Sequence, residues 1–212
     1  MQIPLLQPEP LRPLPVDAGQ YVAALQNKPG ELDALRHASA DTWERLTPPV
    51  QFVGPKKRGE PFNPSTIRDW VAKVASAVGA HPVYLDVMRL DPMFKVRTND
   101  GDVPVLQQIF VAARKRRVGF APVAWVGEST AGHRKLVADT ALADGQGLAL
   151  RYRMRAVVPP AGAAVTTFLA DQLASMSVEV TSADLLVDLE YIDPDDELHP
   201  DDMATALRQK LD

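Results

Sequence analysis

Short apolar runs alternate along the chain with stretches in which apolar residues recur every three or four positions. The first run, Val22 to Leu25, predicts a buried strand, and residues 30–38 predict a helix with Leu32 and Leu35 on one face. The apolar run 48–53 predicts the start of the next strand. The rest of the chain repeats this opening strand–helix–strand unit.

The same alternation predicts four more strands and five more helices. Asn63 and Pro64 mark a helix start, because Asn caps the first turn and Pro suits the first helical position. No two strands are joined by a hairpin signal, and the polar stretch from Arg89 to Asp102 is predicted as a long functional loop. The further strands are predicted at 83–88, 120–126, 148–154 and 183–192, and the further helices at 63–78, 102–117, 131–143, 163–176 and from 200 onward.

Six strand–helix units in this order indicate a parallel sheet, because a helical crossover returns each strand to the same direction. Two α/β architectures compete, a TIM-type barrel and a doubly wound open sheet. The segment Lys28-Pro29-Gly30 after the first strand is not the glycine-rich phosphate turn that is typical of the doubly wound fold. We therefore predict a TIM-barrel-like parallel (βα) repeat. With six units against the usual eight or so, the barrel is incomplete, or the arm or another chain supplies further strands.

Composition divides the chain into an arm and one domain. Five prolines fall in the first fifteen residues, which predicts an extended arm over 1–20 ahead of a single domain over 21–212. The net charge of -4 argues against a general nucleic-acid or anionic-membrane binder. The sequence has no apolar run of about 20 residues, no signal-peptide pattern and no cysteine, so we expect a cytoplasmic protein without disulfides.

Several short motifs point to one family. The stretch Tyr21-Val22-Ala23-Ala24-Leu25, followed by residues 28–35 (KPGELDAL), resembles the opening of the phage-type Beta protein family. Residues 46–50, 147–151 and 185–192 resemble later strands of that family. The resemblance implies a TIM-barrel-like domain from bacteria or their phages, and hence a bacterial or phage-infected host. It brings no biochemical activity with it. Members of the family are generally longer than this chain and lack its proline-rich arm.

Charged residues gather at the predicted carboxyl ends of the strands, where parallel α/β folds bind their ligands. One hypothesis is a divalent-metal site formed by three carboxylates, with cations beside it that grip a phosphate or an acidic group. The alternative is an ion-pair layer that only fills the barrel. The carboxylate candidates are Asp86, Asp188 and Glu190, and the anion-binding candidates are Lys28, Arg151 and Arg153.

Two basic runs complete the list of candidate sites. Lys56, Lys57 and Arg58 lie in the loop after the second strand, on the side where the strands end, and are candidates for binding an anion. The run from Arg114 to Arg117 closes a helix, where cations complement the helix dipole. Neither run has the interleaved aromatic residues of a single-strand nucleic-acid platform, so we do not expect nucleic acid as a partner. The four histidines have no metal-ligand spacing, so we do not expect a zinc site.

These observations leave two main functions open. The first is a binding or interaction module that associates with itself as a homo-oligomer or docks a protein partner, because an incomplete barrel leaves strand edges that need cover. The second is a metal-assisted hydrolase or lyase acting on a phosphorylated or acidic small molecule at the strand ends. The residues do not name a substrate.

Overall fold

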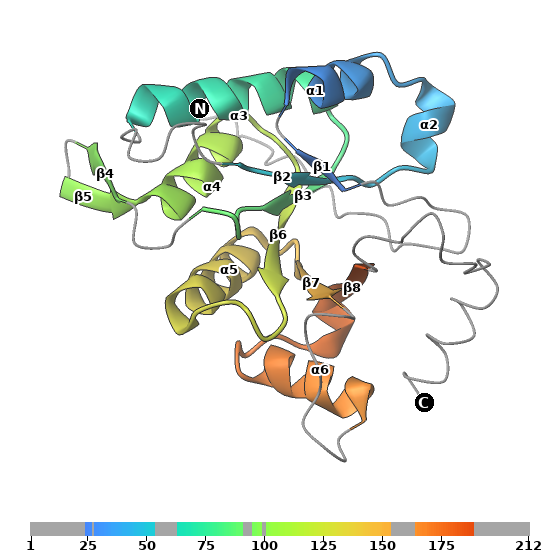
Figure 1. Cartoon of the computed structure of the whole chain (residues 1–212), viewed down its shortest axis with the longest axis vertical. Helices are drawn as coiled ribbons and strands as arrows, with labels where there is room; N and C mark the ends of the chain where they lie inside the picture. Colours follow the sequence, from blue (N-terminus) through green and yellow to red (C-terminus); the bar gives the residue numbers. More distant parts are fainter. Residues whose placement is uncertain are drawn as a thin grey trace, which may run out of the picture.

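A computed structural model describes residues 24–26, 28–53, 63–90, 95–98, 101–153 and 164–188. Six parallel strands form one curved sheet whose strand order follows the chain (Figure 1). A doubly wound sheet would reverse its strand order at a switch point, and this sheet does not. The predicted TIM-barrel-like, incomplete barrel is confirmed. Its strands are β1 (Leu25–Gln26), β2 (Pro49–Gln51), β3 (Val83–Asp86), β6 (Phe120–Trp125), β7 (Leu148–Arg153) and β8 (Ala183–Asp188).

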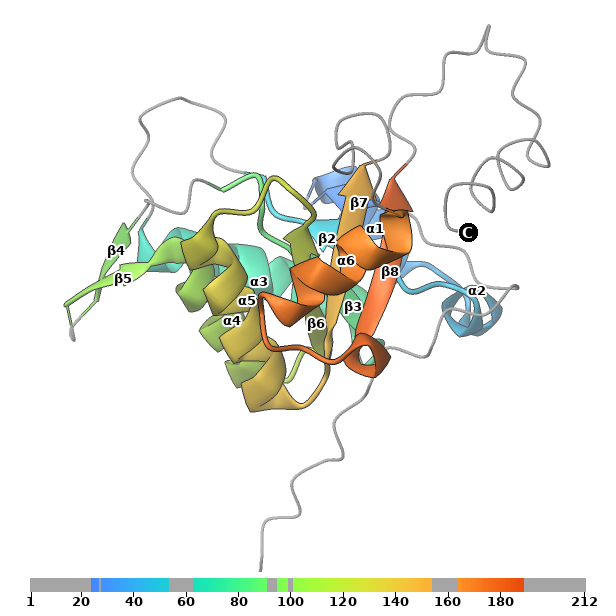
Figure 2. The same cartoon turned by 90° about the horizontal axis from the view of Figure 1, so that it is seen from below.

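Helices between the strands follow the outside of the sheet, with α3 packed between α1 and α4 (Figure 1). Side chains cap three of the described helix starts: the side chains of Ser39, Asn63 and Thr130 accept hydrogen bonds from the backbone N–H groups of Thr42, Thr66 and His133. Figure 2 shows β7 and β8 side by side with α6 across them. The helices are α1 (Pro29–Arg36), α2 (Ala40–Glu44), α3 (Pro64–Val78), α4 (Val105–Lys115), α5 (Ala131–Asp144) and α6 (Val165–Ala174).

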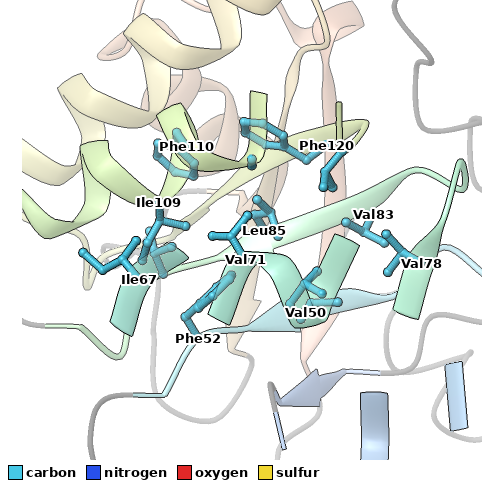
Figure 3. Packing of buried hydrophobic residues seen from close by; sticks show 14 of the residues in the cluster. Val50, Phe52, Ile67, Val71, Val78, Val83, Leu85, Ile109, Phe110 and Phe120 are labelled. Carbon is cyan, nitrogen blue, oxygen red and sulfur yellow. The ribbon is translucent and has the colours of Figure 1, made fainter. Parts of the chain in front are cut away.

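Alternation along the strands divides the core into an outer and an inner layer. Outward-facing residues of the first strands pack against α3 and α4, as Leu85 and Phe120 do with Val71, Ile109 and Phe110 (Figure 3). A second outer cluster packs β7 against α5 and α6. Inward-facing residues form a separate cluster inside the barrel that comprises Tyr84, Ala121, Val123, Trp125, Ala149 and Leu186.

The prediction of a loop from Arg89 to Asp102 is wrong, because this segment contains strands of an antiparallel hairpin. Strand β4 (Lys95–Thr98) pairs with β5 (Gly101–Pro104), and the helix predicted from 102 begins at Val105 instead. Val96 on β4 is completely buried, but a single buried apolar residue gives an alternation too weak to recognise in the sequence. Gly101 has a φ of +114°, which a glycine adopts without strain at the turn. The short helix α2 and the 3₁₀ turn Val180–Ser182 were also not predicted.

Several predictions fall on residues outside those described. They are the arm over 1–20, the start of the first strand over 22–23, the basic run 56–58, the end of the sixth strand over 189–192 and the last helix from 200. In the described part of the chain, no helix has the length and apolar character needed to cross a bilayer.

Candidate functional site

The carboxyl ends of β3, β6, β7 and β8 surround an open hollow of about 780 Å³, which we call the mouth. Strand register brings its residues together: Trp125 on β6 pairs with Arg151 on β7, and Arg153 pairs with Asp188 on β8. Gln51 on β2 pairs in the same way with Asp86 on β3. The mouth is lined by Met88, Arg89, Trp125, Glu128, Arg151, Arg153 and Asp188.

Asp86 lies beneath the mouth, bonded to Trp125 and Arg151 of its lining, and is completely buried. Its Oδ2 accepts hydrogen bonds from Nε2 of Gln51 (3.1 Å), Nε1 of Trp125 (2.9 Å) and Nη1 of Arg151 (2.8 Å). Its Oδ1 accepts a further bond of 3.0 Å from the backbone N–H of Met88. Four donors therefore take the place of water around this carboxylate, as a buried charge requires.

Arg151 bridges this carboxylate to a second one. Its Nε and Nη2 donate to Oδ2 of Asp188 over 2.9 and 2.6 Å, while Nη1 binds Asp86. Its side chain is only 13% exposed. The bridge links β3, β7 and β8 through one guanidinium and two carboxylates, so removal of any member leaves a charge that is poorly compensated.

The predicted metal site does not fit this arrangement. A divalent ion held by Asp86 and Asp188 would need the space between them, and the guanidinium of Arg151 occupies it. The third proposed ligand, Glu190, lies outside the described residues. Within the described ranges, no three or more His, Asp or Glu side chains form a group that would hold a metal. The geometry of Asp86 and Asp188 matches the ion-pair alternative instead.

Arg153 occupies the rim of the mouth. Its Nη1 lies 3.0 Å from both carboxylate oxygens of Glu128, and the two side chains are 29% and 33% exposed. The guanidinium carbons of Arg151 and Arg153 lie 4.8 and 5.4 Å from the centre of the Trp125 ring, within cation–π distance. The indole N–H of Trp125 is bound to Asp86, so the ring is fixed as a wall of the mouth.

Behind Trp125, a buried serine and histidine support the turn that follows β6. Oγ of Ser129 accepts a bond of 2.9 Å from the backbone N–H of Trp125 and lies 3.3 Å from Nδ1 of His133. Burial lowers the pKa of His133 to about 4, although the negative charge of Asp86 acts in the opposite direction. Nε2 of His133 is buried and has no hydrogen-bond partner in the described structure. His133 is therefore neutral at physiological pH and does not line the mouth.

A hollow of about 660 Å³ lies outside the barrel, between α5 and residues 175–182. Leu142, which is 86% exposed, lies on its wall. Lys135 and Asp139, also on its wall, form an ion pair with each other over 2.7 Å. It holds no convergent set of polar groups comparable to the mouth.

The structure brings some of the predicted site residues together and separates others. Asp86, Asp188 and Arg151 form one network, and Arg153 joins them at the rim. Lys28 is exposed at the N-cap of α1 and does not line the mouth. Glu190 and the run 56–58 lie outside the described residues.

Sequence reasoning missed Trp125 and gave Arg89 no role in a site. Trp125 shares its strand face with Val123, an inward residue, so the period of two along β6 was the available signal. Arg89 is exposed, lines the mouth, and makes no ion pair within the described part of the chain.

Comparison with known proteins gives a family and a distant structural neighbour. No curated protein matches the chain. A solved structure of a sugar phosphate isomerase/epimerase from Parabacteroides distasonis ATCC 8503 is similar, with 12% sequence identity and a TM-score of 0.43. The similarity covers 80% of this chain and 60% of that chain, and at this level it carries no inference about activity. The family model named Beta protein matches residues 21–212, which includes the opening motif and all the described strands. The chain belongs to the Beta protein family.

Proposed function

We propose that this chain is a binding module that takes a small anionic ligand at the mouth of its incomplete barrel. The distribution of charge with depth carries the proposal. Of the carboxylates, Asp86 is completely buried, Asp188 is 22% exposed, and Glu128, which pairs with Arg153 at the rim, is 33% exposed. Of the arginines, Arg89 is exposed and Arg153 is 29% exposed. A ligand that approaches from solvent therefore meets the guanidinium of Arg89 and the Arg153–Glu128 pair before it meets Asp86 and Asp188.

Arginine is well suited to this task, because its planar fork of N–H donors matches the oxygens of carboxylates and phosphates. The ring of Trp125 supports the guanidiniums of Arg151 and Arg153. Because these side chains are already ordered, they lose less conformational entropy when a ligand binds. The buried network below keeps Arg151 in place. The mouth is thus an anion site whose cations are already positioned.

The same contacts favour binding over catalysis. A general base needs a carboxylate or imidazole that is available to take up a proton. Asp86 already accepts four hydrogen bonds, and Asp188 accepts two from Arg151. His133 is buried behind Trp125. The alternative, a metal-assisted hydrolase or lyase, is less favoured, because the guanidinium of Arg151 fills the space between Asp86 and Asp188 where its metal would bind.

Titration of the full chain with sodium acetate, sodium succinate and inorganic phosphate tests the proposal. Calorimetry at constant ionic strength, with chloride as the balancing salt, measures the binding. We expect saturable binding of at least one anion, which is lost in Arg89→Gln and in Arg153→Gln. Arg97→Gln is the matched control, because Arg97 pairs with Asp102 on the β4–β5 hairpin and does not line the mouth. Equal binding by Arg153→Gln and Arg97→Gln, or no binding of any of the three anions, would overturn the proposal.

Self-association and docking of a protein partner stay predictions. In the described sheet β8 is the last strand, so its second edge pairs with no described strand. Light scattering on the full chain tests self-association directly. A mass equal to the 23.1 kDa of one chain at all concentrations would contradict it.

A further inference from the structure

The two arginines of β7 differ in how firmly their carboxylates hold them. Arg151 is 13% exposed and contacts aspartates on two other strands. Arg153 is 29% exposed and contacts Glu128, which lies in the turn after β6 and not on a strand. Water screens a pair at the rim far more than a pair in the interior. The Glu128–Arg153 pair is therefore exchangeable, whereas the pairs that Arg151 forms with Asp86 and Asp188 are not.

The carboxylate of Glu128 already occupies the position that an incoming anion would take. Both of its oxygens lie 3.0 Å from Nη1 of Arg153, at the rim of the mouth. The Trp125 ring lies beside the same guanidinium, at 5.4 Å, and is fixed by its own bond to Asp86. If Glu128 turned away into solvent, Arg153 would keep this support and would present to the mouth the Nη1 donor that Glu128 now occupies.

We propose that Glu128 is a built-in competitor for the ligand of the mouth, and that this ligand presents a carboxylate to Arg153. The inference rests on the proposed anion-binding function and adds a chemical class and a means of regulation to it. A planar carboxylate reproduces the contacts that Glu128 makes. A phosphate dianion would bring a second negative charge toward Glu128 and Asp188, which both line the mouth. The ligand is accordingly a small carboxylic acid, and Glu128 sets the threshold concentration at which it binds.

Glu128→Gln tests this competition, because it removes the charge and keeps the size of the side chain. We expect Glu128→Gln to bind acetate about two- to fivefold more tightly than the natural chain, the range expected for loss of one exposed ion pair. Asp139→Asn is the matched control: Asp139 is an exposed carboxylate paired with Lys135 over 2.7 Å on α5. Its acetate affinity should be unchanged. Acetate should also bind more tightly than inorganic phosphate to both the natural chain and Glu128→Gln.

The outcomes separate this inference from the function on which it rests. If the natural chain binds acetate, Arg153→Gln does not, and Glu128→Gln shows no gain, the competitor role is wrong and the binding function stands. Tighter binding of phosphate than of acetate would overturn the carboxylate class. If only Glu128→Gln binds acetate and the natural chain binds none of the anions, the competitor role of Glu128 is supported and the proposed binding function of the natural chain is overturned. If neither protein binds any anion while both unfold at the same temperature, the binding function itself is wrong.

Discussion

The hydroxyl of Tyr84 on β3 donates a hydrogen bond of 3.0 Å to the carboxylate of Asp184 on β8, across the interior of the barrel. Two strands, β6 and β7, stand between β3 and β8 in the sheet. Arg151 joins the same two strands at the mouth, through Asp86 and Asp188. Backbone pairing among the described strands leaves the sheet open, so these two polar links at different depths help to hold its curvature.

Tyr84→Phe should destabilise the fold by about 1 to 2 kcal/mol, because Asp184 loses a hydrogen bond inside the barrel. Burial, followed by the charge and hydrogen bond of Asp184, raises the pKa of Tyr84, so the donor is protonated throughout the physiological range. Burial also raises the pKa of Asp184, and the bond from Tyr84 partly opposes that rise. Urea unfolding measures the loss. Asp184→Asn is the control and should cost less, because its amide oxygen still accepts the bond. If Tyr84→Phe and the natural chain were equally stable, the Tyr84–Asp184 bond would not help to hold the curvature of the sheet.

Asp86→Ala should cost about 3 to 5 kcal/mol of folding free energy, because it leaves the Arg151 guanidinium partly unpaired and the donors of Gln51 and Trp125 without an acceptor. Arg151→Met should be similarly harmful, since it leaves two carboxylates without their cation. The double variant should lose clearly less folding free energy than the sum of the two single losses, because each single change leaves the other partner of the pair buried and unpaired. Urea unfolding of the four proteins completes the cycle. Additive losses would show that the two side chains do not act as one unit.

The order of the barrel strands and of the longer helices was predictable, because these strands contain short apolar runs and these helices have an apolar stripe. Both faces of a parallel strand are covered, which is why the runs are unbroken in β3 and β6. The β4–β5 hairpin was not predicted, because Val96 is its one fully buried apolar residue. The helix α2 was not predicted, because none of its five residues is buried.

The candidate site was only half predictable. Asp86, Arg151 and Asp188 were predicted at the carboxyl ends of their strands, and the structure brings these ends together. Whether two aspartates hold a metal or a guanidinium depends on where one long side chain lies, and no pattern in the sequence contains that information. The pairing of Glu128 with Arg153 depends on the turn at Gly127, where φ is +73°.

Gly147→Ala should destabilise the chain, whereas Gly132→Ala should not. Gly147 has a φ of +71°, and a Cβ there would overlap with the carbonyl oxygen of Ser182, the residue just before β8. Both the backbone conformation and the space at this position therefore exclude a side chain. Gly132 lies in the first turn of α5, and a Cβ there would meet no atom within 4 Å. Alanine should leave stability unchanged or raise it by up to about 1 kcal/mol at Gly132. Thermal unfolding compares the two variants, and equal melting temperatures would contradict the close approach of β7 to β8.

His133 should make the fold less stable as the pH falls from about 6.5 toward 4. Its pKa is about 4 in the folded protein because the ring is buried, against 6.5 for the exposed side chain. Over this interval the unfolded chain binds a proton that the folded chain does not, so stability is fully present above pH 6.5 and decreases as the pH falls. The difference between the two pKa values corresponds to about 3 kcal/mol at most.

The test compares unfolding free energies between pH 7 and pH 5, above the range in which most carboxylates titrate. His133→Gln should flatten this dependence, because an amide also bonds to Ser129 but does not titrate. His37→Gln should keep the dependence of the natural chain, since His37 is exposed at the end of α1. If His133→Gln and the natural chain lost stability in parallel, then His133 would have to take up its proton in the folded state. That would require a charged imidazole to be accommodated behind Trp125, beside the buried network that anchors the mouth.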